Sequence, residues 1–275
     1  MKYWVHEEGS KGQEVKRIQQ VLNLEPDGDF GPITKQAVKQ YQSENGLTID
    51  SKVGPATRAS MAIEIYAGID ISAYQKNIDW NTLKQSGLAN FCWIKTTEGN
   101  SHVQKTIKSH FSGAKSVNIP AGGYHFARPD LHDDPHKEIE NFAKNCPVFT
   151  GGMRPVLDFE TAGAHTANSL RDWVLTFLRQ TEKKLGTKPI LYTGGNMVKY
   201  HLNRDTTGLD EYELWHAYYS QKAFKSGIKK DRLGNWNDWS IWQWTGSGSI
   251  QGIPGDVDRN WLPGGESAFS NLRVR

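Results

Sequence analysis

The chain has 275 residues, with 33 basic and 30 acidic side chains and a formal net charge of +3. An apolar fraction of 37% with 23% charged residues is typical of a globular protein and excludes a disordered chain. The basic residues are spread along the sequence and form no block, so we expect no nucleic-acid partner.

The two cysteines, Cys92 and Cys146, lie in an apolar run and at the end of an amphipathic helix, as small buried side chains do. Two cysteines in a chain this long indicate neither a disulfide scaffold nor a zinc site, so we expect no metal and no other cofactor. Met1–Glu8 lacks the apolar core of a signal peptide, and no segment is apolar enough to span a bilayer. We therefore expect a protein held in the cytoplasm of the producing cell, with no membrane partner.

An internal repeat lies in the N-terminal part of the chain. Asp27–Thr34 recurs as Asp50–Thr57, and each copy contains a Gly-Pro pair. The pair opens a helix, because proline at the first helical position loses no hydrogen bond. Apolar residues recur at helical spacing over Glu14–Leu22 and again from Pro32. Residues 1–66 are therefore expected to form a small all-α domain of three helices, near the lower size limit for an independent core.

From Gly68 onward, short apolar strands alternate with amphipathic helices. A helix begins near Asp134, and a longer one stops at Gly186. The expected strands are Ile69–Ile71, Phe91–Ile94, Gly122–Phe126, Val156–Phe159, Ile190–Tyr192, Leu214–Ala217 and Ile241–Trp244. This alternation predicts an α/β fold with a parallel (β/α) barrel over residues 67–275. The helical pattern fades after Gly186, so the last third of the barrel should be irregular.

Polar side chains gather at the carboxyl ends of these strands. They are Asp70, Lys95 with Glu98, His125, Asp158 with Glu160, Tyr192 and Gln243, and Arg128 and Asp258 are expected in the loops that follow. The carboxyl ends of barrel strands surround one mouth, where active sites of such barrels lie.

The run Pro155–Glu160 carries two carboxylates, Asp158 and Glu160. Residues two apart on a strand face the same side, with Cα atoms roughly 7 Å apart. Two like charges this close push the two pKa values apart, so that one group stays protonated near neutral pH. One acid and one base or stabilising group is what cleavage of a glycosidic bond requires.

A series of motifs runs along residues 68–262. They are Gly68–Gln75, Ile78–Trp80, Ile94–Gly99, Gly123–Pro129, Leu157–Glu160, Ile190–Tyr192, Leu214–Tyr219, Ile241–Trp244 and Gly252–Asp258. In this order they resemble the glycoside hydrolase family 25 lysozymes. The resemblance implies an irregular TIM-like barrel with five βα units followed by bare strands. Thr96-Thr97 and His216 depart from the small or aliphatic residues usual in that family.

The N-terminal repeat resembles the peptidoglycan-binding domain-like family. The motif positions are Gly12, Val15, Gln19, Leu22, Asp27–Thr34, Val38, Tyr41-Gln42 and Gly46-Leu47. The second copy has Asp50-Ser51 where that family usually has Asp-Gly, a change that a turn can accommodate. The resemblance implies that residues 1–66 anchor the chain to the bacterial wall.

The family 25 resemblance implies retaining hydrolysis of the β-1,4 bond from N-acetylmuramic acid to N-acetylglucosamine in peptidoglycan. Glu160 would protonate the leaving oxygen and then activate water, and Asp158 would stabilise the substrate's own 2-acetamido group as the nucleophile. A carboxylate nucleophile stays open. Asp70 would complete the catalytic set. Further substrate-binding residues would be Asp258, Tyr124, Tyr192, Trp215, Gln243, Lys95 and His125.

Three alternatives remain at this point. A family 18 chitinase also uses D-x-E, but with a longer acidic run where this chain has Arg154–Leu157. A wall amidase needs zinc ligands such as H-E-x-x-H, which the sequence lacks. A wall-binding lectin on an inactive barrel would not need Asp70, Asp158 and Glu160 intact. We expect a monomeric phage endolysin, admitted to the wall by a holin pore, and a bacterial autolysin is the other possible source.

Overall fold

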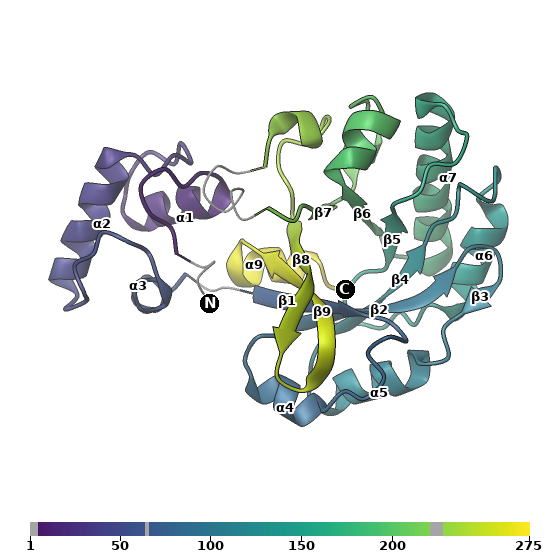
Figure 1. The fold of residues 1–275 in the computed structure, drawn as a ribbon, viewed down its shortest axis with the longest axis horizontal. Coiled ribbons are helices and arrows are strands. Elements are labelled where there is room, and N and C mark those ends of the chain that lie inside the picture. The colour runs from purple at the N-terminus through teal and green to yellow at the C-terminus, as the bar shows by residue number, and fades with distance from the viewer. Residues whose placement is uncertain (1–4, 64–65, 221–227) are drawn as a thin grey trace. The chain divides into compact units, whose positions relative to one another are not determined.

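The computed structural model describes residues 5–63, 66–220 and 228–275 (Figure 1). The chain folds into two compact units. The first comprises mainly the residues up to 65, and the second comprises most of the chain from Tyr66 onward. Within the described residues, no helix is both long enough and apolar enough to cross a membrane.

The first unit contains three helices, α1 (Gln13–Val21), α2 (Pro32–Glu44) and α3 (Pro55–Ser60). Proline occupies the first turn of both α2 and α3, as the two Gly-Pro pairs predict. The helices bury a small apolar core of Val15, Ile18, Phe30, Val38, Val53, Met61 and Ile63. The expected three-helix, all-α domain is therefore confirmed.

The sequence repeat is also a repeat of hydrogen bonds. The amide of Gln19 donates to the side chain of Asp27 and the carbonyl of Asp29, and its oxygen accepts from the backbone of Gly28. Gln42 makes the same three bonds to Asp50–Lys52. Ser51 stands at the position of Gly28 with φ +60°, and Gly28 itself has φ +78°. The turn accepts serine in the left-handed region, at some strain, because the glutamine bonds hold it there.

The second unit is a closed barrel of eight strands. They are β1 (Tyr66–Ile71), β2 (Phe91–Glu98), β4 (Ala121–Phe126), β5 (Val156–Phe159), β6 (Ile190–Gly194), β7 (Leu214–Ala217), β8 (Ile241–Ile250) and β9 (Ile253–Leu262). β1 closes the barrel by pairing with both β2 and β9. All neighbours are parallel except β9, which is antiparallel to β8 and β1. The short β3 (His102–Val103) extends β2 as a hairpin.

Among the residues that the structure describes, α-helices cover the first part of the barrel and shorter helical turns follow β6. The α-helical crossovers are α4 (Trp80–Gln85), α5 (Ile107–Ser116), α6 (His136–Asn145) and α7 (Ala167–Leu185). After β6 the connections carry the π-helix η2 (Met197–His201) and the 3₁₀ turns η3 (Leu209–Glu211) and η4 (Lys230–Arg232), and α9 (Gly265–Asn271) follows β9. β8 and β9 join directly. The irregular TIM-like barrel with bare final strands is therefore confirmed.

Strand β9 was missed from the sequence, which placed Asp258 in a loop. The strand begins with Ile253-Pro-Gly-Asp, residues typical of a turn, so only its second half alternates. β9 pairs with β1, which precedes it by almost the whole barrel, and Asp258 lies directly opposite Asp70. Asp258 therefore sits on the barrel wall.

Candidate active site

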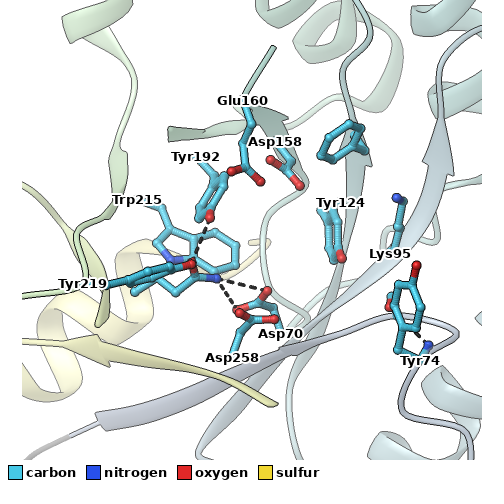
Figure 2. A pocket seen from close by; sticks show the side chains of 13 residues that line it. Asp70, Tyr74, Lys95, Tyr124, Asp158, Glu160, Tyr192, Trp215, Tyr219 and Asp258 are labelled. Carbon is cyan, nitrogen blue, oxygen red and sulfur yellow. Dashed lines mark hydrogen bonds between the residues drawn. The ribbon is translucent and has the colours of Figure 1, made fainter. Parts of the chain in front are cut away.

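A cavity of about 240 Å³ opens at the carboxyl ends of the barrel strands (Figure 2). Its walls are strongly polar and aromatic: Asp70, Ser72, Tyr74, Lys95, Tyr124, Phe126, Asp158, Glu160, Tyr192, Trp215, Tyr219, Gln243 and Asp258. Strand register explains part of this set. Phe126, Asp158, Tyr192 and Trp215 are paired one to the next across β4, β5, β6 and β7, so they form one row around the mouth.

Asp158 and Glu160 come from the end of β5 and point toward each other, as the D-x-E spacing predicts (Figure 2). Burial raises the pKa of Asp158 well above its usual range, and the nearby Glu160 and Asp70 raise it further. Glu160 lies at the open rim, where desolvation by the walls raises its pKa. A hydrogen bond from Asp158 and the charge of Lys95 oppose that rise. The pair is therefore arranged to share one proton.

Asp70, on β1, is the most completely hydrogen-bonded acid in the cavity. Its carboxylate accepts from the Gln243 amide at 3.0 and 3.2 Å and from the Asn260 amide at 2.7 Å. Burial raises the pKa of Asp70 to about 6, against these hydrogen bonds, which lower it. An acid held this rigidly is suited to orienting neighbouring groups.

Asp258 faces Asp70 from β9, and burial together with the charges of Asp70 and Glu160 raises its pKa to about 8. Four carboxyl groups thus line one cavity: Asp70, Asp158, Glu160 and Asp258. Lys95 is the cation that lines the cavity with them. Such strong mutual perturbation within a cleft is typical of a functional site.

Aromatic side chains orient two amide groups beside Asp70. Gln243 accepts from the hydroxyls of Tyr192, at 2.8 Å, and Tyr219, which fixes its amide so that its nitrogen faces Asp70. Trp215 donates from its indole to Asn260 at 2.9 Å, which similarly turns the Asn260 amide toward Asp70. Each amide is therefore oriented before any ligand enters.

Within the described residues, no group of three or more His, Cys, Asp or Glu side chains could hold a metal ion. The carboxyl groups of the cavity perturb one another's pKa values and are suited to proton transfer and charge stabilisation.

The sequence model described as glycosyl hydrolases family 25 matches residues 69–253, about two thirds of the chain. This segment contains the second half of β1, all of β2 to β8, and every cavity residue except Asp258. The chain belongs to this family. A second model, described as putative peptidoglycan binding domain, matches residues 11–61.

Individual relatives agree with the family assignment. The uncharacterized protein YegX of Escherichia coli K12 is 32% identical over 74% of this chain and 74% of its own length. Lysozyme M1 of Streptomyces globisporus is 26% identical over 87% of this chain and 81% of its own length. The crystal structure of the bacterial lysozyme from Streptomyces coelicolor superposes with a TM-score of 0.69 and 24% identity, covering 76% of this chain and 97% of that one. This family 25 chain is a glycoside hydrolase with the family's fold.

Nine of the ten site residues expected from the sequence line the cavity, and His125 does not. It is fully buried behind β4, where it bonds Glu138 at 2.8 Å and Thr97 at 2.7 Å and stacks on Phe177. Neighbouring side chains on a strand alternate, so Tyr124 and Phe126 face the mouth and His125 faces the helices. The expectation that His125 contacts sugar is thereby corrected.

Other cavity residues were not assigned from the sequence. They are Ser72, Tyr74, Phe126 and Tyr219 on the walls and Asn260 behind Asp70. Tyr74 and Tyr219 are 92% and 60% exposed, although most large aromatic side chains of the barrel are buried. Asn260 could have been found by counting two residues on from Asp258, once β9 was recognised as a strand.

Proposed function

We propose that this family 25 hydrolase cleaves the β-1,4 bond from N-acetylmuramic acid to N-acetylglucosamine in peptidoglycan, with retention. The observation that carries the proposal is the pair of facing carboxyl groups of Asp158 and Glu160, which line one cavity with Asp70 and Asp258 and whose pKa values burial raises. The names of similar proteins support it, because Lysozyme M1 is similar over most of both chains. The peptidoglycan-binding match over residues 11–61 supports the same polymer as substrate.

In the proposed first step, Glu160 holds the shared proton and gives it to the glycosidic oxygen. As that oxygen leaves, the carbonyl oxygen of the substrate's 2-acetamido group attacks the anomeric carbon. Asp158, which is ionised because Glu160 held the shared proton, accepts a hydrogen bond from the acetamido N–H and stabilises the positive charge that develops. Glu160 then takes a proton from water, which attacks the anomeric carbon from the side the leaving group vacated.

The remaining cavity residues would bind and orient the sugar. Asp70, held by Gln243 and Asn260, would keep the Asp158 side chain in place. Asp258, with a pKa of about 8, would donate or accept a hydrogen bond with a sugar hydroxyl at neutral pH. Tyr124, Tyr192 and Trp215 would form the sugar-facing wall, with Lys95 beside them.

The two-unit architecture suggests a division of labour. We propose that α1–α3 bind the wall and keep the barrel close to successive bonds, which raises its effective concentration without changing the chemical step. We further propose a monomer, acting as a phage endolysin that is made in the cytoplasm and reaches the wall through a holin pore. Fractionation of producing cells with and without a pore-forming protein, and light scattering of the purified chain, test these points.

The decisive experiment is digestion of purified peptidoglycan, followed by borohydride reduction and identification of the new reducing ends. Reduced N-acetylmuramic acid is the expected product. Reduced N-acetylglucosamine or new amino termini would assign a different reaction, and no new ends would indicate a lectin. Peptidoglycan without N-acetyl groups tests the substrate-assisted step, because efficient cleavage of that polymer would contradict it.

A further inference from the structure

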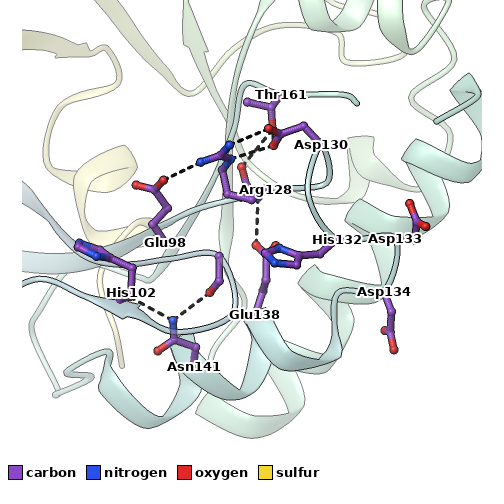
Figure 3. Close-up of polar contacts among 12 residues, drawn as sticks. Glu98, His102, Arg128, Asp130, His132, Asp133, Asp134, Glu138, Asn141 and Thr161 are labelled. Carbon is purple, nitrogen blue, oxygen red and sulfur yellow. Dashed lines mark hydrogen bonds and ion pairs between the residues drawn. The ribbon is translucent and has the colours of Figure 1, made fainter. Parts of the chain in front are cut away.

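A series of charged contacts leads away from the cavity at Lys95, and Figure 3 shows its outer part, from Glu98 through Arg128 to Asp130 and Thr161. Lys95 Nζ donates to Glu98 at 2.7 Å, and Arg128 donates to the other Glu98 oxygen at 3.0 Å. The same guanidinium forks onto both oxygens of Asp130, at 2.9 and 2.8 Å. Thr161 Oγ1 then donates to Asp130 at 2.8 Å. We call Lys95, Glu98, Arg128, Asp130 and Thr161 the Arg128 network.

The network joins strand β2 to the segment that directly follows the catalytic pair. Lys95 and Glu98 belong to β2, Arg128 and Asp130 to the loop after β4, and Thr161 directly follows Glu160. Arg128 contacts both Glu98 on β2 and Asp130, the carboxylate that accepts a hydrogen bond from Thr161. Its planar, forked guanidinium is suited to bridging two carboxylates at fixed angles.

The backbone at Arg128 has its own anchor, which does not depend on the guanidinium. Glu138, fully buried on α6, accepts from the Arg128 amide at 3.1 Å. It also accepts from His125 Nε2 and His132 Nδ1, each at 2.8 Å. A change confined to the Arg128 side chain should therefore leave the loop in place.

The cation at the inner end of the network acts on the catalytic pair. Lys95 lowers the pKa of both Asp158 and Glu160, whereas burial raises both. The titratable and charged groups that line the cavity around Glu160 are Asp158 (β5), Asp70 (β1), Tyr74 (after β1), Asp258 (β9), Lys95 (β2), Tyr124 (β4), Tyr192 (β6) and Tyr219 (after β7). Lys95 is the positive one in this set, so its position matters to the proton balance.

We infer that Arg128 is a positioning residue: through Glu98 it fixes the Lys95 ammonium beside the catalytic carboxyl groups, and through Asp130 and Thr161 it fixes the segment that carries Glu160. The inference rests on the proposed function for its kinetic consequences. Its electrostatic consequence, a change in the pKa of Glu160 in the free protein, does not depend on the proposed function.

Arg128→Lys tests the inference because it keeps the charge and loses the fork. The pKa of Glu160 should rise, as followed by carboxyl ¹³C NMR of glutamate-labelled protein and assigned by the signal missing in Glu160→Gln. On peptidoglycan, kcat should fall about 10-fold and KM change less than about 3-fold, because a small misplacement of catalytic groups is costly. The bell-shaped pH profile of kcat should shift to higher pH. Glu98→Asp, which shortens the link and keeps its charge, should act in the same direction.

Asp133→Asn is the matched control. Asp133 lies in the same loop, is exposed and points away from the network (Figure 3), so its variant should titrate and react like wild type. Lys95→Met sets the limit of the electrostatic effect, so adding Arg128→Lys to it should raise the pKa of Glu160 no further. The double variant should still lose kcat relative to Lys95→Met, because the contacts of Arg128 to Asp130 and of Asp130 to Thr161 do not involve Lys95. A wild-type Glu160 titration in Arg128→Lys, or a lower kcat with an unmoved pH profile, would overturn the inference. A wild-type protein inactive on peptidoglycan would overturn the proposed function alone, because the NMR shift would still decide the role of Arg128.

Discussion

Each of the two units buries charge, but they treat it differently. In the first unit, Arg58 is 2% exposed and donates to Glu14 at 3.0 Å and to His6, so a buried cation meets a buried anion. In the barrel, four carboxyl groups surround one cavity with Lys95 as the cation beside them. The first arrangement is compensated, and the second is under electrostatic strain.

The difference separates structural charge from functional charge. A compensated buried pair loses stability when either partner is removed, because the other is left unpaired. An uncompensated cluster costs stability and is retained for what its perturbed protons can do. Opposite responses to charge removal are therefore expected in the two units.

The largest effect is expected at the centre of the strained cluster. Glu160→Gln should lower the rate of wall lysis by about 10²–10⁴-fold, because it removes the transferable proton. The melting temperature should stay equal or rise, because one repelling carboxylate is gone. Turbidity clearance of cell walls and calorimetry measure the two. A residual rate above a tenth of wild type would place the acid elsewhere, and a lower melting temperature would contradict the strain argument.

The compensated pair should respond in the opposite direction. Arg58→Met should destabilise the first unit by about 3–5 kcal/mol, because Glu14 stays buried without the Arg58 guanidinium and keeps the longer contact to Arg17 at 3.9 Å. Hydrogen exchange should lose protection over α1–α3 and keep it in the barrel strands. Lys35→Met removes a surface partner of Glu8 and should cost less than about 1 kcal/mol. Equal losses of stability for Arg58→Met and Lys35→Met would contradict the argument that the buried pair stabilises the first unit.

Several features of the barrel could be predicted from local sequence patterns alone. The bounds of β5 and β7 were predicted correctly, because short apolar runs there end at clear polar residues. The prediction that the Asp158 and Glu160 side chains face the same side needed only the two-residue period of a strand. The same period, applied to Tyr124, would have turned His125 away from the mouth.

Other features depend on pairing that no local pattern carries. The contact of β9 with β1 brings Asp258 and Asn260 to Asp70 from the far end of the barrel sequence. The bonds of Glu138 to His125 and of Arg58 to Glu14 also join separate elements, 13 and 44 positions apart in the sequence. Side-chain ion pairs of this kind require the folded topology before they can be recognised.

The pH dependence of stability gives a smaller test of the strained cluster. The folded pKa of Asp258 is about 8, above its unfolded value of 3.8, so the folded state binds the extra proton between these values. Stability from this group is therefore present at low pH and is lost as pH rises through about 8. Asp258→Asn should flatten the fall in unfolding free energy between pH 4 and 8, as measured by urea titration at several pH values. An unchanged slope would place the strain elsewhere in the cluster.

The smallest expected effect has the opposite sign and also comes from the barrel. Burial, with a contribution from Arg232, lowers the pKa of His216 from 6.5 to about 3, and neither ring nitrogen has a hydrogen-bond partner among the described residues. Below pH 6.5, His216 therefore binds a proton in the unfolded chain but not in the folded chain. Stability is lost as pH falls from 6.5 toward 3.

His216→Leu should remove this acid sensitivity and leave stability near pH 8 almost unchanged, because the ring is packed as an apolar group. His136→Leu is the matched control, since His136 lies exposed on the same unit beside Asp134. Compared with wild type and the control, urea titrations should give His216→Leu a higher unfolding free energy at pH 5 and a nearly equal one at pH 8. His6 in the first unit has a similarly lowered pKa of about 3 beside Arg58, so it should keep part of the acid sensitivity in every variant. A His216→Leu chain as acid-sensitive as wild type would assign the whole effect to the compensated cluster around Arg58.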